Sequence, residues 1–166
     1  MSLLGTWRGS STENWNPKVS TLLQVMLSIQ AIIMSNEVYF NEPGYEHLMG
    51  TPQGEKLNNG YANIVRYGTL KYAILEQLKN PSAGFEEVIK ESFKIKKPQI
   101  LAEVDDWIKQ AKTEPANYTD SLTTSHNSQI ANDFNSSTDC YHDKLVELRK
   151  ELIGQYEKIE GKSQTS

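Results

Sequence analysis

Two side chains near the carboxyl end of the chain could bind a metal ion. Cys140 and His142 are separated by one residue, and Asp139 precedes them. Thiolate, imidazole and carboxylate groups are the ligands that zinc takes in proteins. Structural zinc sites, however, use four ligands from two such pairs, and no second pair occurs at that spacing in the sequence. The sequence therefore predicts no metal site.

Cys140 could also act as a nucleophile if its surroundings activated the thiol. Activation needs a neighbouring base and a shaped, partly dry pocket, yet Cys140 lies between a polar stretch and the last helix. His126 belongs to that polar stretch and offers no fixed base. We interpret Cys140 as an incidental thiol. The glycines match no phosphate-binding loop, so no cofactor is predicted.

The composition excludes several classes of partner. The chain has 166 residues, of which 37% are hydrophobic and 23% charged, as is typical of a globular domain with one core. A net charge of -4 and a pI near 5.4 disfavour nucleic acid and anionic membranes, because phosphate groups are bound by clustered Lys and Arg. We expect no nucleic-acid partner and no membrane partner. A single cysteine and no evident secretion signal predict a location in the cytoplasm or the nucleus.

The first regular element that the pattern predicts is an amphipathic helix. Residues 1–17 are rich in turn formers and sustain no helical or strand period. From Leu22 to Ile33, apolar residues recur at the spacing of one helical face, and Ser20 or Thr21 can cap the helix. The polar residues Thr21, Gln24 and Ser28 lie on the opposite side. One face of this helix is therefore expected to be buried.

A long connection is predicted after that helix. Residues 36–60 contain two prolines and several glycines, which punctuate the stretch as a loop. Loops of this length are uncommon in compact domains unless their own side chains hold them down. The aromatic residues Tyr39, Phe40 and Tyr45 are the expected anchors.

Three more helices are predicted before the composition of the chain changes. The first spans residues 61–78 and is ended by Asn80-Pro81, the second spans 85–93, and the third begins at Pro98, a residue suited to a first helical turn. No strand pattern is convincing.

The carboxyl third differs in composition. Residues 115–138 are rich in Ser, Thr, Asn and Asp and are predicted to be a linker, followed by a helix over about 139–159. We expect this helix to lie outside the first core, as an appendage or a short coiled-coil seam. The predicted organisation is thus a domain over 1–114, a linker over 115–138, and a helix and tail over 139–166.

Several stretches together resemble a known family. They are SLLGTWRGSSTENWNPKVSTLLQVMLSIQAIIM, NEVYFNEPGYE and GTPQG, followed by helices that end in LEQLKNPS and DDWI. Over residues 2–110 the chain resembles the carboxyl half of the core domain of ubiquitin-conjugating enzymes, above all the giant subgroup that is also of the inhibitor-of-apoptosis type. Trp15-Asn16-Pro17 stands where the family has a Trp-x-Pro before a helix.

This resemblance implies a fold and a reaction. The family fold is α+β, and this chain would represent it mainly by the helical carboxyl half, so that it is mostly α with long loops. The family transfers ubiquitin from a cysteine thioester to a substrate lysine. In the family the thioester cysteine follows a four-stranded meander and a histidine-proline-asparagine motif, none of which occurs in this sequence. Nothing around Cys140 matches that nucleophile. We therefore expect a fragment that is inactive alone. Without the meander, the apolar face of its first helix would be largely uncovered, so we expect the chain to be marginally stable, associated with something that covers that face, or a truncated piece of a longer product.

The resemblance also implies site residues and partners. Asn41 and Glu42 would lie in the loop that orients the substrate lysine, although a surface carboxylate without a role is an equal alternative for Glu42. Trp15 could also be a core residue, and one tryptophan can serve both roles. The expected contact with ligases is made by Trp15, Asn16, Pro17 and Lys18, and the expected ubiquitin-facing side of the helix by Thr21, Gln24 and Ser28. Implied partners are ubiquitin, its activating enzyme and ligases. The alternative function is a non-catalytic helical protein that binds ubiquitin or a ligase.

Overall fold

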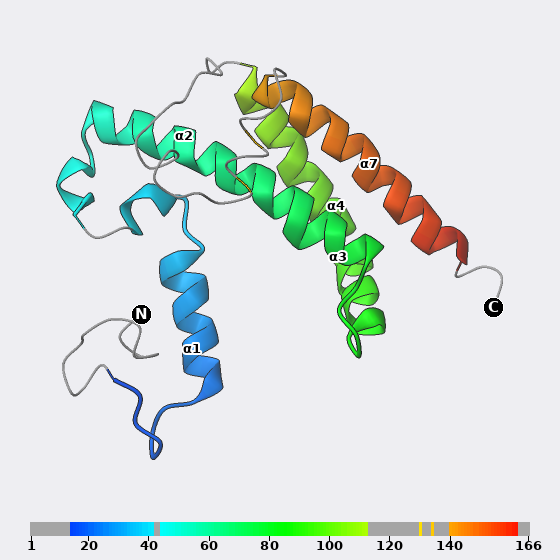
Figure 1. The fold of residues 1–166 in the computed structure, drawn as a ribbon, viewed down its shortest axis with the longest axis horizontal. Helices are drawn as coiled ribbons and strands as arrows, with labels where there is room; N and C mark the ends of the chain where they lie inside the picture. The colour runs from blue at the N-terminus through cyan, green and yellow to red at the C-terminus, as the bar shows by residue number, and fades with distance from the viewer. Residues whose placement is uncertain (1–13, 42–43, 113–129, 131–133, 135–139, 163–166) are drawn as a thin grey trace. The chain divides into compact units, whose positions relative to one another are not determined.

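The computed structural model describes residues 14–41, 44–112, 130, 134 and 140–162. The chain divides into two compact units, Met1–Asn58 and Asn59–Ser166, called here the first and second unit. The described residues are mostly helical and include no strand (Figure 1). This confirms the mostly α prediction for that part of the chain. None of the described helices combines the length and the apolar character needed to cross a membrane.

Helix α1, Leu22–Ser28, begins where the sequence predicts it. Thr21 caps it, because its hydroxyl accepts a hydrogen bond from the Gln24 backbone N–H while the Gln24 side chain accepts one from the Thr21 N–H. This reciprocal pair is a capping box, which satisfies two N–H groups that the helix itself leaves free. The helix continues as the π-helical turn η2, Ile29–Ile33. The predicted helix is therefore confirmed.

The apolar side of α1 is exposed in this structure. Val25 is the one buried residue of α1, whereas Leu22, Leu23 and Met26 keep 68%, 67% and 59% of their surface exposed. The prediction of a largely uncovered face is confirmed for these residues. Burial of apolar area is what normally stabilises an amphipathic helix, so α1 gains little from packing.

The connection after η2 is shorter than predicted. It contains the short 3-10 helices η3, Val38–Asn41, and η4, Glu46–Leu48, and helix α2, Pro52–Gly68, then begins. The expected loop to residue 60 is wrong. Thr51 accepts a hydrogen bond from the Gly54 N–H through its hydroxyl oxygen, and Pro52 takes the first helical position, which tolerates proline.

Gly54 lies in the first turn of α2 and does not break the helix. A glycine is needed there because Leu48 lies too close to leave room for a side chain. A Cβ at Gly54 would lie 2.1 Å from the Leu48 carbonyl oxygen. The glycine therefore permits η4 to pack against the first turn of α2.

The aromatic anchors of the connection are confirmed. Tyr39 is buried and contacts Tyr45 and Phe40, with ring centroids 4.8 Å and 5.5 Å away. The Asn58 side chain on α2 accepts from the Tyr39 N–H at 3.1 Å and donates to the Asn36 carbonyl at 3.0 Å. One amide thus ties two points of the connection to α2.

The second unit contains helices packed around one apolar cluster. Its elements are the end of α2, the π-helical η5 (Thr69–Leu75), α3 (Glu76–Lys79), α4 (Glu86–Ala111) and α7 (Tyr141–Lys162). Helices α4 and α7 run side by side (Figure 1). The cluster is formed by buried residues of each helix, including Ile64, Leu70, Leu75, Leu78, Val104, Leu145, Leu152 and Tyr156.

Helix α4 corrects the prediction of two helices with a break before Pro98. Pro98 lies inside one continuous helix of 26 residues. A proline in a helix interior removes one hydrogen bond and crowds the carbonyl four residues earlier. Val104, which is 1% exposed, packs the carboxyl half of α4 into the cluster and offsets that cost.

Helix α7 corrects the prediction of an appendage. Leu145, Leu152 and Tyr156 are fully buried in the same cluster as Ile64 and Val104. Within the expected linker, Phe134 is also buried there, with its ring centroid 5.6 Å from that of Tyr67. The predicted boundaries at residues 114 and 138 lie outside the described residues and stay a prediction.

Candidate functional site

The expected ligase-contact residues form a compact exposed turn before α1. The Asn16 side chain accepts a hydrogen bond from the Lys18 N–H at 3.0 Å, and the Asn16 carbonyl accepts from the Ser20 N–H at 2.8 Å. The Ser20 hydroxyl oxygen in turn accepts from the Asn16 N–H at 2.9 Å. An asparagine side chain that bonds its own backbone two residues on is a common device for fixing a turn.

Trp15 stands at the start of this turn with 46% of its surface exposed. The alternative of a core tryptophan is therefore wrong for this structure. Pro17 and Lys18 are also exposed. The structure thus brings the four expected ligase-contact residues together at the surface, although it does not test the contact itself.

The expected ubiquitin-facing residues lie on α1 or at its cap. Thr21 and Gln24 are exposed and form the capping box, and Ser28 lies at the last position of the helix, half-buried. The side chains of Thr21 and Gln24 therefore have a structural role that the sequence analysis only partly recognised. Their contact with ubiquitin stays a prediction.

The expected lysine-orienting residues are only partly described. Asn41 ends η3 at the surface, and its side-chain N–H donates to the Ile33 carbonyl at 3.1 Å. Glu42 lies outside the described residues. Beyond it, Gly44 has a φ of +98°, and its N–H donates to the Glu46 carboxylate at 2.7 Å. The hydrogen bond from the Glu46 backbone N–H, and after it that from Gly44, lowers the pKa of Glu46.

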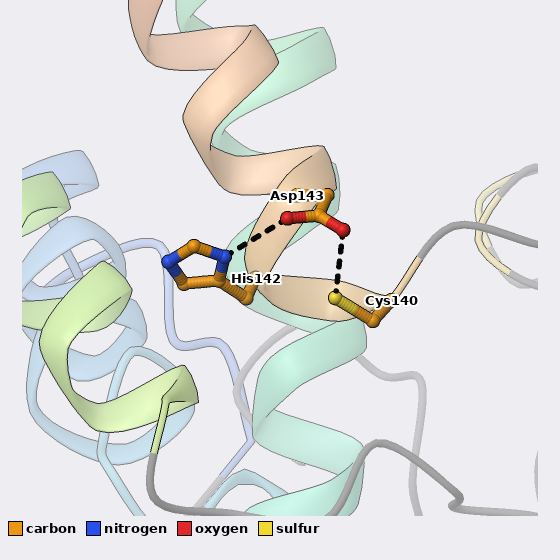
Figure 2. Close-up of side chains that lie close together, drawn as sticks. All are labelled: Cys140, His142 and Asp143. Atoms are coloured by element: carbon orange, nitrogen blue, oxygen red, sulfur yellow. Dashed lines mark hydrogen bonds and ion pairs between the residues drawn. The ribbon is translucent and has the colours of Figure 1, made fainter.

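Three chemically active side chains meet at the start of α7 (Figure 2). The Cys140 thiol donates to Asp143 Oδ2 at 3.1 Å, and His142 Nδ1 lies 3.0 Å from Asp143 Oδ1. The hydrogen bond from Cys140, and after it that from His142, lowers the pKa of Asp143. Sequence analysis had paired Cys140 and His142 with Asp139 and missed Asp143. The signal was the spacing of three residues, which places positions 140 and 143 on one side of a helical turn.

This arrangement is a poor one for a nucleophilic cysteine. An activated cysteine needs a base that removes its proton or a positive charge that stabilises the thiolate. The group bonded to Cys140 Sγ is instead a carboxylate, and His142 is bonded to the other carboxylate oxygen. The local geometry therefore agrees with the interpretation of Cys140 as unactivated.

Curated proteins show what this chain is similar to. A probable ubiquitin-conjugating enzyme of Acanthamoeba polyphaga mimivirus is 49% identical over 111 residues, which are 67% of this chain and 8% of that protein. The dual E2 ubiquitin-conjugating enzyme/E3 ubiquitin-protein ligase BIRC6 of Homo sapiens is 46% identical over 108 residues, 65% of this chain and 2% of that protein. This part of the chain is homologous to ubiquitin-conjugating enzymes.

A third ubiquitin-conjugating relative, protein 17 of Caenorhabditis elegans, is 45% identical over 108 residues, 65% of this chain and 15% of that protein. The chain thus spans only a small share of the ubiquitin-conjugating proteins that it matches. No protein-family model matches it. The resemblance stated from the sequence motifs, including the giant subgroup, is confirmed.

Proposed function

We propose that this chain takes part in ubiquitin conjugation, contributing a segment equivalent to the helical carboxyl half of a conjugating core. The observation that carries the proposal is the 45–49% identity to ubiquitin-conjugating enzymes over 108 to 111 residues. The α+β family fold is part of the same proposal. The all-helical described region agrees with the half of that fold that this chain would represent.

We propose further that this chain does not itself accept ubiquitin as a thioester. Its sequence contains one cysteine, Cys140, so a thioester could form only there. The Cys140 thiol is hydrogen-bonded to the carboxylate of Asp143, and nothing in the sequence around it resembles the family's nucleophile. These facts support an inactive thiol and a catalytic residue supplied elsewhere.

Within this function, the exposed turn from Trp15 to Lys18 is the proposed contact with a ligase. A half-exposed tryptophan on a hydrogen-bonded turn supplies apolar contact area at little cost in ordering, because the turn is already fixed. The proposed ubiquitin-facing residues Thr21, Gln24 and Ser28 follow directly on α1. Asn41 and Glu42 remain the proposed lysine-orienting residues.

The thioester proposal has a direct test. The purified chain is incubated with activating enzyme, ubiquitin and ATP, and the products are separated with and without a reducing agent. We expect no adduct that the reducing agent removes. Such an adduct on this chain, if absent from the Cys140→Ser variant, would overturn the claim that Cys140 is inactive.

The ubiquitin-facing proposal is tested by titrating unlabelled ubiquitin into isotope-labelled chain and following the backbone amide signals. Shifts are expected at Thr21, Gln24 and Ser28. The variant Ser28→Arg should weaken binding, whereas Ser82→Arg, at an exposed position of the second unit, should not. Gln24→Glu is a useful third variant, because glutamate at this position preserves the capping box while it changes the surface charge. Absence of any shift at millimolar ubiquitin would count against the proposal.

The second candidate is a non-catalytic protein that binds ubiquitin or a ligase. The unactivated geometry of Cys140 favours it. The two candidate functions predict different coding sequences before Met1. An in-frame cysteine segment preceded by a histidine-proline-asparagine motif supports conjugation, and a stop codon there, together with ubiquitin binding in the titration, supports the second candidate.

A further inference from the structure

The side chains of Cys140, His142 and Asp143 form a cluster that neither proposed function uses. Each offers one ligand atom, and these atoms all lie within 4.8 Å of one another. The Cys140 Sγ to Asp143 Oδ2 distance is 3.1 Å, and the His142 Nδ1 to Asp143 Oδ1 distance is 3.0 Å. Ligands that share one zinc ion lie about 3 to 4 Å apart, given metal-ligand distances of about 2.0 to 2.3 Å. The set needs only one carboxylate oxygen, and whichever of the two binds, one of these separations already meets that requirement.

Backbone hydrogen bonds fix the position of Cys140 at the start of α7. The Cys140 carbonyl accepts hydrogen bonds from the N–H groups of Asp143 and Lys144, at 3.1 Å and 3.2 Å, so Cys140 is the residue from which α7 starts. This closes one helical turn and places the side chains of Cys140 and Asp143 on the same side of it. The helical turn therefore places the thiol and the carboxylate close enough to share a ligand.

The residues next to the ligands in the sequence are held by the core. Tyr141 is 6% exposed and Leu145 fully buried, and both belong to the apolar cluster of the second unit. Lys144 is also buried, and its ammonium group donates to the Phe134 carbonyl. A site whose supporting residues are packed loses little entropy when a ligand binds.

The histidine presents one particular nitrogen to the cluster. Nε2 is buried and has no hydrogen-bond partner among the described residues, while Nδ1 points to Asp143, as Figure 2 shows. Nδ1 is thus the ring nitrogen that a metal at this position would use. Cys140 and Asp143 lie at the surface, which leaves an entry path.

We propose that Cys140, His142 and Asp143 bind one zinc ion through Sγ, Nδ1 and a carboxylate oxygen. On binding, the thiol proton passes to solvent, and the imidazole coordinates as its neutral tautomer with the proton on Nε2, so that Nδ1 offers its lone pair to the ion. A thiolate, a neutral imidazole and a carboxylate carry two negative charges together and match a divalent, borderline-soft cation. Three protein ligands leave the fourth tetrahedral position to water or to an external ligand.

The sequence argument against a metal considered only closed sites with four ligands. An open site needs three, and the third, Asp143, becomes evident from the helical turn. The proposal is independent of ubiquitin conjugation, because no residue of the turn at Trp15 or of α1 takes part.

Cobalt(II) is the probe for the test, since it occupies zinc sites and a thiolate ligand gives it a charge-transfer band in the near ultraviolet. Titration of the full chain should produce this band with one ion bound per chain, and added zinc should abolish it. Cys140→Ser should remove the band. His142→Gln and Asp143→Asn should each weaken cobalt binding by about tenfold or more, because even outer-shell partners of a metal contribute that much.

Matched controls are His47→Gln and Asp106→Asn, at exposed positions outside the cluster, which should bind cobalt as the unchanged chain does. Far-ultraviolet circular dichroism checks that each variant keeps its helices. No band in a large excess of cobalt, with the helices intact, would overturn the proposal. A band of unchanged affinity in both His142→Gln and Asp143→Asn would overturn it too, because the ion would then need only the thiol.

Discussion

Arg149 on α7 donates two hydrogen bonds to the carboxylate of Asp105 on α4, from Nε to Oδ1 at 2.5 Å and from Nη2 to Oδ2 at 3.0 Å. The two side chains are 32% and 42% exposed. The side-chain hydrogen bond from Arg149 is the main cause that lowers the pKa of Asp105, and the same bond raises the pKa of Arg149. This pair fixes the alignment of two helices whose apolar sides meet in the core.

A double-mutant cycle with Arg149→Met and Asp105→Asn should give a coupling of about 1 kcal/mol in urea unfolding. The two-bond geometry places the pair at the upper end of the range for exposed ion pairs. The matched pair is Lys109 with Asp106, which are three residues apart on α4 and more exposed, and whose coupling should be smaller. A larger coupling for Lys109 with Asp106 would contradict the prediction that the pair of Arg149 and Asp105 contributes more to stability.

The same pair predicts a specific pH dependence. The folded pKa of Asp105 lies below its ordinary value of 3.8, so its contribution is complete above that value and is lost as the pH falls through the folded pKa. The unfolding free energies of the unchanged chain and of Arg149→Met should therefore differ at neutral pH and converge in acid. Unfolding curves over a pH series measure this, and a constant difference down to the lowest pH would refute it.

Leu152→Ala should destabilise the second unit by about 2 to 5 kcal/mol, the usual cost of emptying a buried leucine site. Leu152 is fully buried on α7. The control is Val88→Ala on α4, where the side chain is 66% exposed and the change should stay within about 0.5 kcal/mol. Equal effects of the two changes in thermal or urea unfolding would mean that α7 does not belong to the core.

Gly54→Ala should destabilise the start of α2 by about 1 to 3 kcal/mol, because its Cβ would lie 2.1 Å from the Leu48 carbonyl oxygen and force the backbone apart. Gly154 in α7 is the matched control, since no atom lies within 4 Å of a Cβ built there. Gly154→Ala should instead stabilise the helix by about 0.5 to 1 kcal/mol. Thermal unfolding distinguishes the two, and effects of the same sign would be inconsistent with the packing of η4 on α2.

Tyr156→Phe should leave the stability unchanged or raise it. The side chain is fully buried and its hydroxyl has no hydrogen-bond partner in the described part of the chain, so removing the oxygen removes an unsatisfied polar atom. Burial raises the pKa of Tyr156 to about 12. Absorbance titration at alkaline pH should therefore show one late-titrating tyrosine that disappears in the variant. Loss of stability in Tyr156→Phe would point to a missing partner for the hydroxyl.

Local signals predicted the elements that depend on neighbouring residues. A cap at Ser20 or Thr21, a stop at Asn80-Pro81 and aromatic anchors near Tyr39 all follow from short-range chemistry. The structure confirms the stop and the anchors and shows Thr21 as the cap. The prediction of an exposed apolar side of α1 came from the resemblance, which implied that another segment covers this side in the family.

The predictions were wrong where a contact with another part of the chain decides the local conformation of a residue. Pro52 and Gly54 were interpreted as loop formers, but Thr51 and the Leu48 carbonyl make them the start of α2. Pro98 was placed at a helix start, although packing of Val104 carries α4 through it. The pattern of α7 shows an apolar stripe, but nothing in it identifies the surface that the stripe contacts.

Pro98 divides α4 into two parts that are packed to different extents. Before the proline, Phe85, Val88 and Ile95 are 61%, 66% and 79% exposed, whereas the later half holds Val104 in the core. The proline also has no N–H with which to continue the helical hydrogen bonds. Amide hydrogen exchange should therefore show that α4 opens as two cooperative segments. The amides before Pro98 should exchange well before those after it.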